Sequence, residues 1–135
     1  MGIPNEGSRM KKPSIPSLRR KLDKVFSVFI RRRDSNAEGY GKCCSCGAWK
    51  HWNAANAGHF IKRQHTATRY DERNVHFQCV VCNFHRHGNL IEYCEFMRDR
   101  YGAGIIDELR QLQRTTVKYT RADYEAMIAK YGRAG

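Results

Sequence analysis

The sequence predicts a small α+β domain in which two cysteine pairs hold together an irregular central region flanked by helices. Cys43 with Cys46 and Cys79 with Cys82 form two Cys-x-x-Cys pairs, and the 32 residues between the pairs show no helical periodicity. Apolar residues at helical spacing precede and follow this region. With 135 residues, the chain suits one domain with a modest core.

A basic helix is predicted over residues 17–38, after a disordered basic lead over residues 1–16, which contain three prolines. Ser17 can cap this helix, and the stretch RRRD over residues 31–34 ends it. Its apolar residues recur at helical spacing: Leu18, Leu22, Val25, Phe26, Phe29 and Ile30. Its polar face could contact phosphates or simply be solvated, and it carries Arg19, Arg20, Lys24 and Arg31.

Residues 39–101 are expected to form the centre of a single domain that runs from residue 17 to residue 135. Strands are predicted over 57–62 and 74–79, the second because Val75, Phe77 and Cys79 alternate with polar residues. Helical patterns return afterwards, and C-terminal helices fill 102–135. The expected signals are a cap at Asn89, a stop at Gly102, a helix over Ala103–Arg114, and a capping box of Thr120 with Asp123 that opens a last helix through Tyr131 to Gly132.

The net charge of +12, from 25 Lys and Arg against 13 Asp and Glu, favours a polyanionic partner, most simply nucleic acid. The alternative is a basic surface that only confers solubility. The sequence has no run of eighteen apolar residues, so no membrane span is predicted. The N-terminal residues are polar and lack the apolar segment of a signal peptide, so a cytoplasmic protein is expected.

The two cysteine pairs predict a structural zinc site. In the stretch KCCSCG only Cys43 with Cys46 gives the Cys-x-x-Cys spacing, and Cys79 with Cys82 supplies the second pair. Four thiolates would close a tetrahedral site and leave no position for water. The alternatives are two reduced pairs or disulfides. Cys44 and Cys94 remain, and both are expected to be small, buried or half-buried side chains.

The order of motifs resembles the HNH, or ββα-metal, nuclease motif. The chain contains a Cys-x-x-Cys, a histidine in AGHF, an asparagine before NVHFQC, and a second Cys-x-x-Cys followed by asparagine. From about residue 25 to about residue 131 it also resembles the NinG (Rap) family of lambdoid phage recombination endonucleases, most densely in RYDERNVHFQCVVCN. Endonuclease VII-type phage resolvases share the asparagine directly after the last cysteine. No further cysteine-rich segment precedes the first pair, so functions located in such a segment are not expected.

This resemblance implies a zinc-stapled ββα-metal (HNH-like) nuclease core. His59 would be the general base, Asn74 would orient the loop, and Asn83 would bind a catalytic Mg²⁺ or Mn²⁺. The residues fit this chemistry, because a neutral imidazole is a suitable base near pH 7 and Mg²⁺ prefers oxygen ligands. We therefore expect hydrolysis that leaves 5′-phosphate and 3′-hydroxyl ends.

The motif departs from many HNH enzymes at Gly58, where an Asp or His often precedes the base. His87 lies four residues after Asn83, so one helical turn would make it a second ligand of the catalytic ion; the alternative is a surface or phosphate contact. Basic residues near the proposed centre could bind DNA phosphates: Lys62, Arg63, Arg69 and Arg73. Structural roles are predicted for His51, His65 and His76, and hairpin packing, rather than base stacking, for Trp49 and Trp52.

The family resemblance further implies a branched DNA substrate, such as Holliday junctions and D-loops. Two nicks in a four-way junction would need two active sites, so a homodimer is expected, acting in a bacterial host as a phage- or prophage-encoded protein. One alternative is an HNH nickase of ordinary duplex DNA, for example in phage packaging. The other is a non-catalytic zinc-dependent DNA-binding module, which the missing side chain at position 58 would favour.

Overall fold

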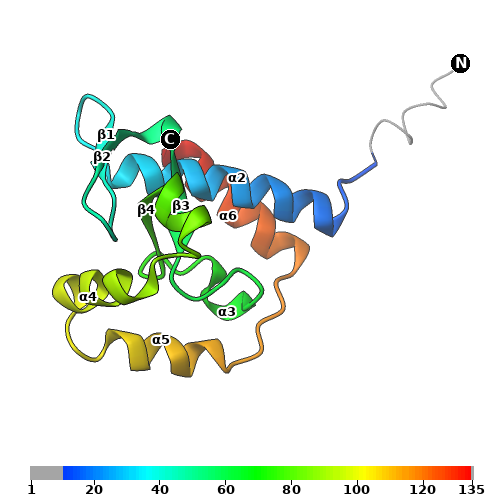
Figure 1. The fold of residues 1–135 in the computed structure, drawn as a ribbon. Coiled ribbons are helices and arrows are strands. Elements are labelled where there is room, and N and C mark those ends of the chain that lie inside the picture. The colour runs from blue at the N-terminus through cyan, green and yellow to red at the C-terminus, as the bar shows by residue number, and fades with distance from the viewer. Residues whose placement is uncertain (1–10, 135) are drawn as a thin grey trace, which may run out of the picture.

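The computed structural model describes residues 11–134 as a mixed α+β fold with two small antiparallel sheets among helices (Figure 1). Each sheet is a two-stranded hairpin, β1 with β2 and β3 with β4. The elements in chain order are α2 (Ile15–Arg33), β1 (Tyr40–Lys42), β2 (Trp49–His51), η1 (Trp52–Ala54), β3 (Ala55–His59), α3 (Thr66–Arg69), β4 (Val75–Cys79), η2 (Val81–His85), α4 (Leu90–Tyr101), α5 (Ile105–Gln113) and α6 (Arg121–Ala134).

Helix α2 begins at Ile15, two residues before the predicted start. Ser14, not Ser17, is the cap, because the Ser14 Oγ accepts a hydrogen bond of 3.2 Å from the backbone N–H of Ser17. Pro16 fits this first turn, where its missing N–H has no helical partner to lose. The helix ends at Arg33, within the stretch RRRD that was predicted to end it, so residues 34–38 of the predicted segment are not helical. Residues 1–10 of the predicted lead lie outside the described part.

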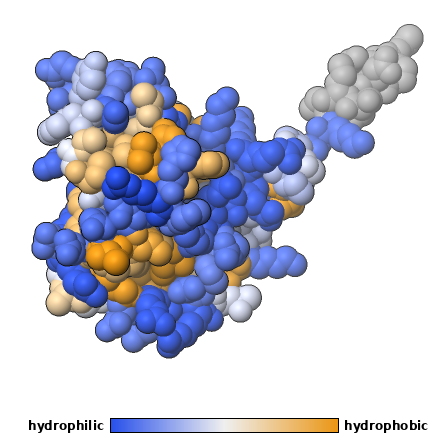
Figure 2. All heavy atoms as spheres, in the orientation of Figure 1, coloured by the Kyte–Doolittle hydropathy of each residue, from blue (hydrophilic) through white to orange (hydrophobic). Residues whose placement is uncertain are grey.

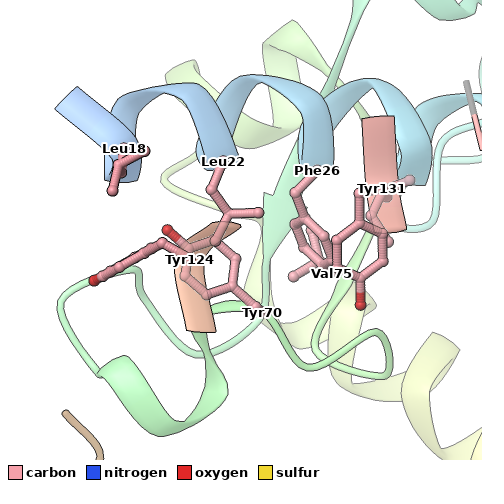
Figure 3. Close-up of a cluster of buried hydrophobic side chains, with 8 residues drawn as sticks. Leu18, Leu22, Phe26, Tyr70, Val75, Tyr124 and Tyr131 are labelled. Atoms are coloured by element: carbon pink, nitrogen blue, oxygen red, sulfur yellow. The ribbon is translucent and has the colours of Figure 1, made fainter. Parts of the chain in front are cut away.

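The apolar stripe of α2 forms the first core, as its periodicity predicted. Leu22 and Phe26 point from the helix toward Tyr70, while Tyr131 of α6 closes over Phe26 (Figure 3). The Phe26 and Tyr131 rings pack edge to face, with centroids 4.8 Å apart. Helices α2 and α6, from opposite ends of the described chain, therefore share one core, whose other buried members are Leu18, Ile30, Val75 and Tyr124.

Strand β4 is buried along its whole length because elements cover both of its faces. Val75 belongs to the core under α2, whereas His76 points to the opposite side and contacts Tyr93 and Tyr101 of α4. The alternation of side chains along β4 was predicted correctly. Strand β3 pairs with β4 in antiparallel register, from Ala55 opposite Cys79 to His59 opposite Val75.

The predicted strand over residues 57–62 was placed too far along the chain, since β3 ends at His59. The reason is the side chain of Asn74, fifteen residues after His59, which accepts from the N–H of Ile61 and donates to its C=O, at 2.8 and 3.0 Å. Both backbone groups of Ile61 are thereby removed from strand pairing.

The C-terminal helices follow the predicted order. Gly102 ends α4 with φ of 101°, a left-handed value that glycine adopts without strain. The capping box is confirmed, since the Thr120 N–H donates to Asp123 Oδ2 at 2.8 Å and the Asp123 N–H donates to Thr120 Oγ1 at 3.1 Å. Asn89 stands at the start of α4, but its side chain does not cap the helix. Within residues 11–134, no helix has both the length and the apolar character needed to cross a bilayer.

Candidate metal centre and active-site cleft

The two cysteine pairs meet in one cluster, as the sequence predicted. The Sγ atoms of Cys43, Cys46, Cys79 and Cys82 all lie within 4.8 Å of one another, and those of Cys46 and Cys79 are 3.7 Å apart. Tetrahedral zinc with Zn–S bonds of about 2.3 Å holds its sulfurs roughly 3.8 Å apart. The cluster could therefore bind a zinc ion.

The first pair lies in the turn between β1 and β2, where backbone N–H groups point at a sulfur. The N–H groups of Ser45 and Cys46 approach the Cys43 Sγ at 3.4 and 3.5 Å. Burial alone would raise the pKa of the Cys43 thiol, but N–H groups around it, that of Cys79 among them, lower this pKa to about 7. Gly47, with φ of 79°, lets the chain turn back into β2.

The second pair joins the end of β4 to η2. The N–H of Cys82 donates to the Cys79 Sγ, and the side-chain Nδ2 of Asn89 donates to the Cys82 Sγ, both at 3.4 Å. The side chain of Asn89, a residue with a φ of 44°, thus bonds to this sulfur and does not cap α4. Cys44 and Cys94 lie outside the cluster and are half-buried, as expected.

A cleft of about 710 Å³ brings two of the predicted catalytic residues together. His59 at the end of β3 and Asn83 in η2 both line it, although 23 residues separate them in sequence. Helix α2 forms another wall, which the sequence did not indicate. The lining residues are Asp23, Phe26, Ser27, Asn56, Ala57, His59, Lys62, Arg63, Gln64, Arg69 and Asn83.

His59 is held in one orientation and in its neutral form. Its Nε2 lies 3.0 Å from the backbone carbonyl oxygen of Arg69, which can only accept, so Nε2 carries the proton and Nδ1 keeps a lone pair. Burial is the main cause that lowers the pKa of His59 to about 4, and the nearby charges of Arg63 and Arg69 lower it further. At neutral pH this imidazole can accept a proton through Nδ1.

Asn74 lies outside the cleft and ties the loop between β3 and β4 into place. It is fully buried, and besides its two bonds to Ile61 its Nδ2 donates to the carbonyl of Thr68 at 3.1 Å. Thr68 immediately precedes Arg69, whose carbonyl orients His59. Asn74 therefore holds in place the loop whose Arg69 carbonyl contacts His59.

Gly58 has no room for the side chain that many HNH enzymes carry before the base. A Cβ built on Gly58 would lie 2.1 Å from the Oε1 of Gln78, which is buried and has no hydrogen-bond partner among the described residues. The carboxylate of this cleft comes instead from Asp23 of α2, which bonds to Arg69 and, at 2.6 Å, to the Tyr70 hydroxyl. The signal for Asp23 in the sequence was an isolated acid within a basic helix.

The four predicted phosphate-binding residues divide into two pairs. Arg69 forms an ion pair with Asp23, and Arg73 forms ion pairs of 2.9 Å with both Asp71 and Glu108. Lys62 and Arg63 are exposed in the cleft, although Lys62 donates to the His87 carbonyl at 3.4 Å and Arg63 lies 4.0 Å from Asp23. The exposed pair is better placed to meet a phosphate.

His87 does not lie one helical turn from Asn83, because η2 ends at His85 and His87 has a left-handed φ of 51°. Structural contacts are found for the histidines that were predicted to have them. His76 is fully buried between the hydroxyls of Tyr93 and Tyr101, at 3.1 and 2.7 Å. The others also have side-chain partners: His51 contacts Asn53, and His65 contacts Gln113.

The two tryptophans differ from each other. Trp52 packs beneath the guanidinium of Arg31, 5.3 Å from ring centroid to Cζ, and its carbonyl accepts from the same group. Trp49 is 61% exposed, so the prediction that it packs in a hairpin was wrong.

Comparisons with known proteins agree on one family. A family model described as "Bacteriophage Lambda NinG protein" matches residues 7–134. Three proteins named "Protein ninG" match over 115 residues, which are 83% of this chain: those of Salmonella phage P22 (34% identical), Escherichia phage 933W (35%) and Escherichia phage lambda (33%). The chain spans about half the length of these curated relatives, namely 52–53%. No solved structure gives a significant match.

Proposed function

The chain belongs to the NinG family of bacteriophage proteins, and from this premise we propose that it is a metal-dependent DNA endonuclease acting on branched DNA. The observation that carries the proposal is a basic-walled cleft in which a neutral His59 lies together with Asn83. The net charge of +12 favours a polyanionic substrate. The names of the relatives state no activity, so the proposal depends on this cleft and on the resemblance to the HNH motif.

His59 is the general base of the proposed reaction. Its unprotonated Nδ1 takes a proton from a water molecule, and the water oxygen forms a bond to phosphorus as the bond from phosphorus to the 3′-oxygen breaks. The leaving 3′-oxygen takes up a proton from solvent water, so the products are a 5′-phosphate and a 3′-hydroxyl, and His59 later releases its proton to solvent. The carbonyl of Arg69 keeps the opposite nitrogen protonated, so that Nδ1 is the atom available for this transfer.

Asn83 would hold a divalent ion, Mg²⁺ or Mn²⁺, through its amide oxygen. Asp23 and Asn56 line the same cleft and offer a carboxylate and a second amide oxygen. This set of hard oxygen donors is the kind that such ions prefer. When bound, the ion supplies positive charge at the phosphate and the leaving 3′-oxygen. His87 is not needed for this set, because η2 ends before it.

The four-cysteine cluster would hold a structural zinc that keeps Asn83 in the cleft. Cys82 directly precedes Asn83, and Cys79 ends the strand paired with the one that carries His59. Zinc on these sulfurs therefore fixes the backbone on which both proposed catalytic residues stand.

Branched recombination intermediates, such as Holliday junctions and D-loops, are the proposed substrates. This part of the proposal comes from the NinG resemblance. A four-way junction offers two equivalent sites, so symmetrical nicking is proposed to use a homodimer in the cytoplasm of the bacterial host.

The test is nicking of a synthetic four-way junction and of a linear duplex with the same arm sequence, in Mg²⁺ and then in Mn²⁺. We expect the wild type to nick the junction faster. His59→Ala should abolish cleavage while zinc content and DNA binding stay unchanged. His51→Ala is the matched control, because His51 lies on β2, outside the cleft, and should leave cleavage intact.

Each alternative gives a different result. Equal nicking of junction and duplex would indicate a duplex nickase. Binding of DNA without cleavage in either metal would indicate a zinc-dependent binding module. Cleavage that survives the His59 substitution would remove His59 as the base.

A further inference from the structure

Two exposed apolar side chains belong to the same short turn as Asn83, which lines the cleft. Phe84 directly follows Asn83 and is 71% exposed, and Val81, in the same turn, is 49% exposed. Both belong to η2, a single π-helical turn. π-helical turns are rare in proteins, and those that occur often lie at functional sites. We call Val81 and Phe84 the apolar rim.

The apolar rim lies within a surface that favours DNA. Residues 73–91 contain no Asp or Glu, and Arg86, two residues after Phe84, is exposed. Lys62, which lines the cleft, donates to the carbonyl of His87 and so lies close to the end of this turn. Figure 2 shows that hydrophobic areas on one face of the molecule are bordered by hydrophilic side chains. Charge complementarity therefore favours a polyanion here over a second copy of a chain with net charge +12.

Paired, stacked bases offer an apolar side chain little free surface. Base faces become available where stacking is interrupted, as at a branch, a bulge or a single-stranded end. Aromatic side chains stack on such faces, and apolar wedges can enter an opened base step. An exposed ring one residue from the residue that would hold the metal ion is suitably placed to contact bases adjoining the cleaved phosphate.

We propose that Phe84, supported by Val81, stacks on unpaired or unstacked bases next to the phosphate in the cleft, and so selects DNA in which stacking is broken. This inference rests on the proposed function, because it assumes that the cleft receives a DNA strand. It assigns to the apolar rim the recognition of open bases, and to Lys62 and Arg63 the contact with phosphates.

The test is binding, which needs no cleavage. Affinities of the zinc-loaded full chain are measured by fluorescence anisotropy, without Mg²⁺ or Mn²⁺, for a duplex with a short unpaired bulge and for the same duplex without it. Wild type should prefer the bulged duplex. Phe84→Ala should weaken binding to the bulge about 5- to 100-fold and change duplex binding little. 2-Aminopurine in the bulge should lose fluorescence with wild type but not with Phe84→Ala.

Two further variants make the result specific. Phe84→Trp keeps an aromatic face and should keep the preference for the bulge. Ile91→Ala is the matched control, because Ile91 is a 75% exposed apolar residue of α4 that does not line the cleft, and it should change neither affinity. Zinc content, measured for each variant, identifies any change in folding.

Several results would overturn the inference: no preference of wild type for the bulge, equal losses on both DNAs, or a Phe84→Ala change from dimer to monomer in sedimentation, which would assign the apolar rim to a second copy. Cleavage assays separate this inference from the nuclease proposal. A wild type that cleaves DNA while Phe84→Ala retains its bulge preference refutes only the stacking role. A wild type that binds bulges through Phe84 but cleaves nothing refutes only the nuclease.

Discussion

Replacing Asn74 by Ala should lower the free energy of unfolding by about 2 to 4 kcal/mol. The substitution leaves two backbone groups without their partner, the N–H and C=O of Ile61, whereas the C=O of Thr68 still accepts from the N–H of Asp71 at 3.2 Å. Asn74 is fully buried, so water cannot readily replace these bonds. Each unsatisfied buried group costs about 1 to 3 kcal/mol, and relaxation of the loop should keep the sum near the lower end of the range.

The measurement is urea unfolding followed by circular dichroism, with zinc present throughout. Asn36→Ala is the matched control. The Asn36 Oδ1 also accepts two backbone N–H groups, those of Glu38 and Tyr40, both at 3.0 Å, but it is exposed and water can take its place. Its substitution should cost about 1 kcal/mol or less. If the two substitutions cost the same, Asn74 does not hold the loop in the way described.

Three further predictions concern the pKa of His59, the metal and the space at Gly58. In an NMR titration His59 should change protonation near pH 4, because burial lowers its pKa to about 4. The rate of cleavage should fall over the same pH range. An unfolded histidine titrates near 6.5, so the unfolded chain binds more protons between these values and stability should fall as pH is lowered from about 6.5 to 4; a titration near 6.5 in the folded protein would contradict the burial. Metal analysis should find one zinc per chain, lost together with folding in Cys43→Ser but retained in Cys94→Ser; equal zinc in both would exclude the cluster as the site. Gly58→Ala should destabilise the protein by about 1 to 3 kcal/mol through its clash with Gln78. When Gln78 is already Ala, the same Gly58→Ala change should cost much less; equal costs in the two backgrounds would locate the strain elsewhere.

Signals confined to a few neighbouring residues were predicted well from the sequence. The spacing within each cysteine pair fixes two sulfurs on one turn, and the capping box of Thr120 and Asp123 joins groups three residues apart. The same locality explains an error. Asn89 was correctly placed before a helix, but the Cys82 sulfur competes for its side chain, and that sulfur is brought close only by the fold.

Features that depend on distant parts of the chain could not be predicted. The cleft wall on α2, with Asp23, is brought to His59 by packing across more than thirty residues of sequence, and no local pattern encodes that approach. The end of β3 at His59 depends on a side chain fifteen residues further on, that of Asn74. The role of Gly58 likewise becomes visible only once Gln78 on the opposite strand is seen to fill its space.

Helix α2 has two duties, since one side of it packs against α6 while Asp23, Phe26 and Ser27 line the cleft. A minimal fragment designed to keep only the cysteines and the proposed catalytic residues would end before α6. Such a truncation would expose Phe26 where Tyr131 now covers it, and would remove the helix that packs behind the α2 wall of the cleft. Expression boundaries for this family are therefore better chosen by the partner of α2 than by the last recognisable motif.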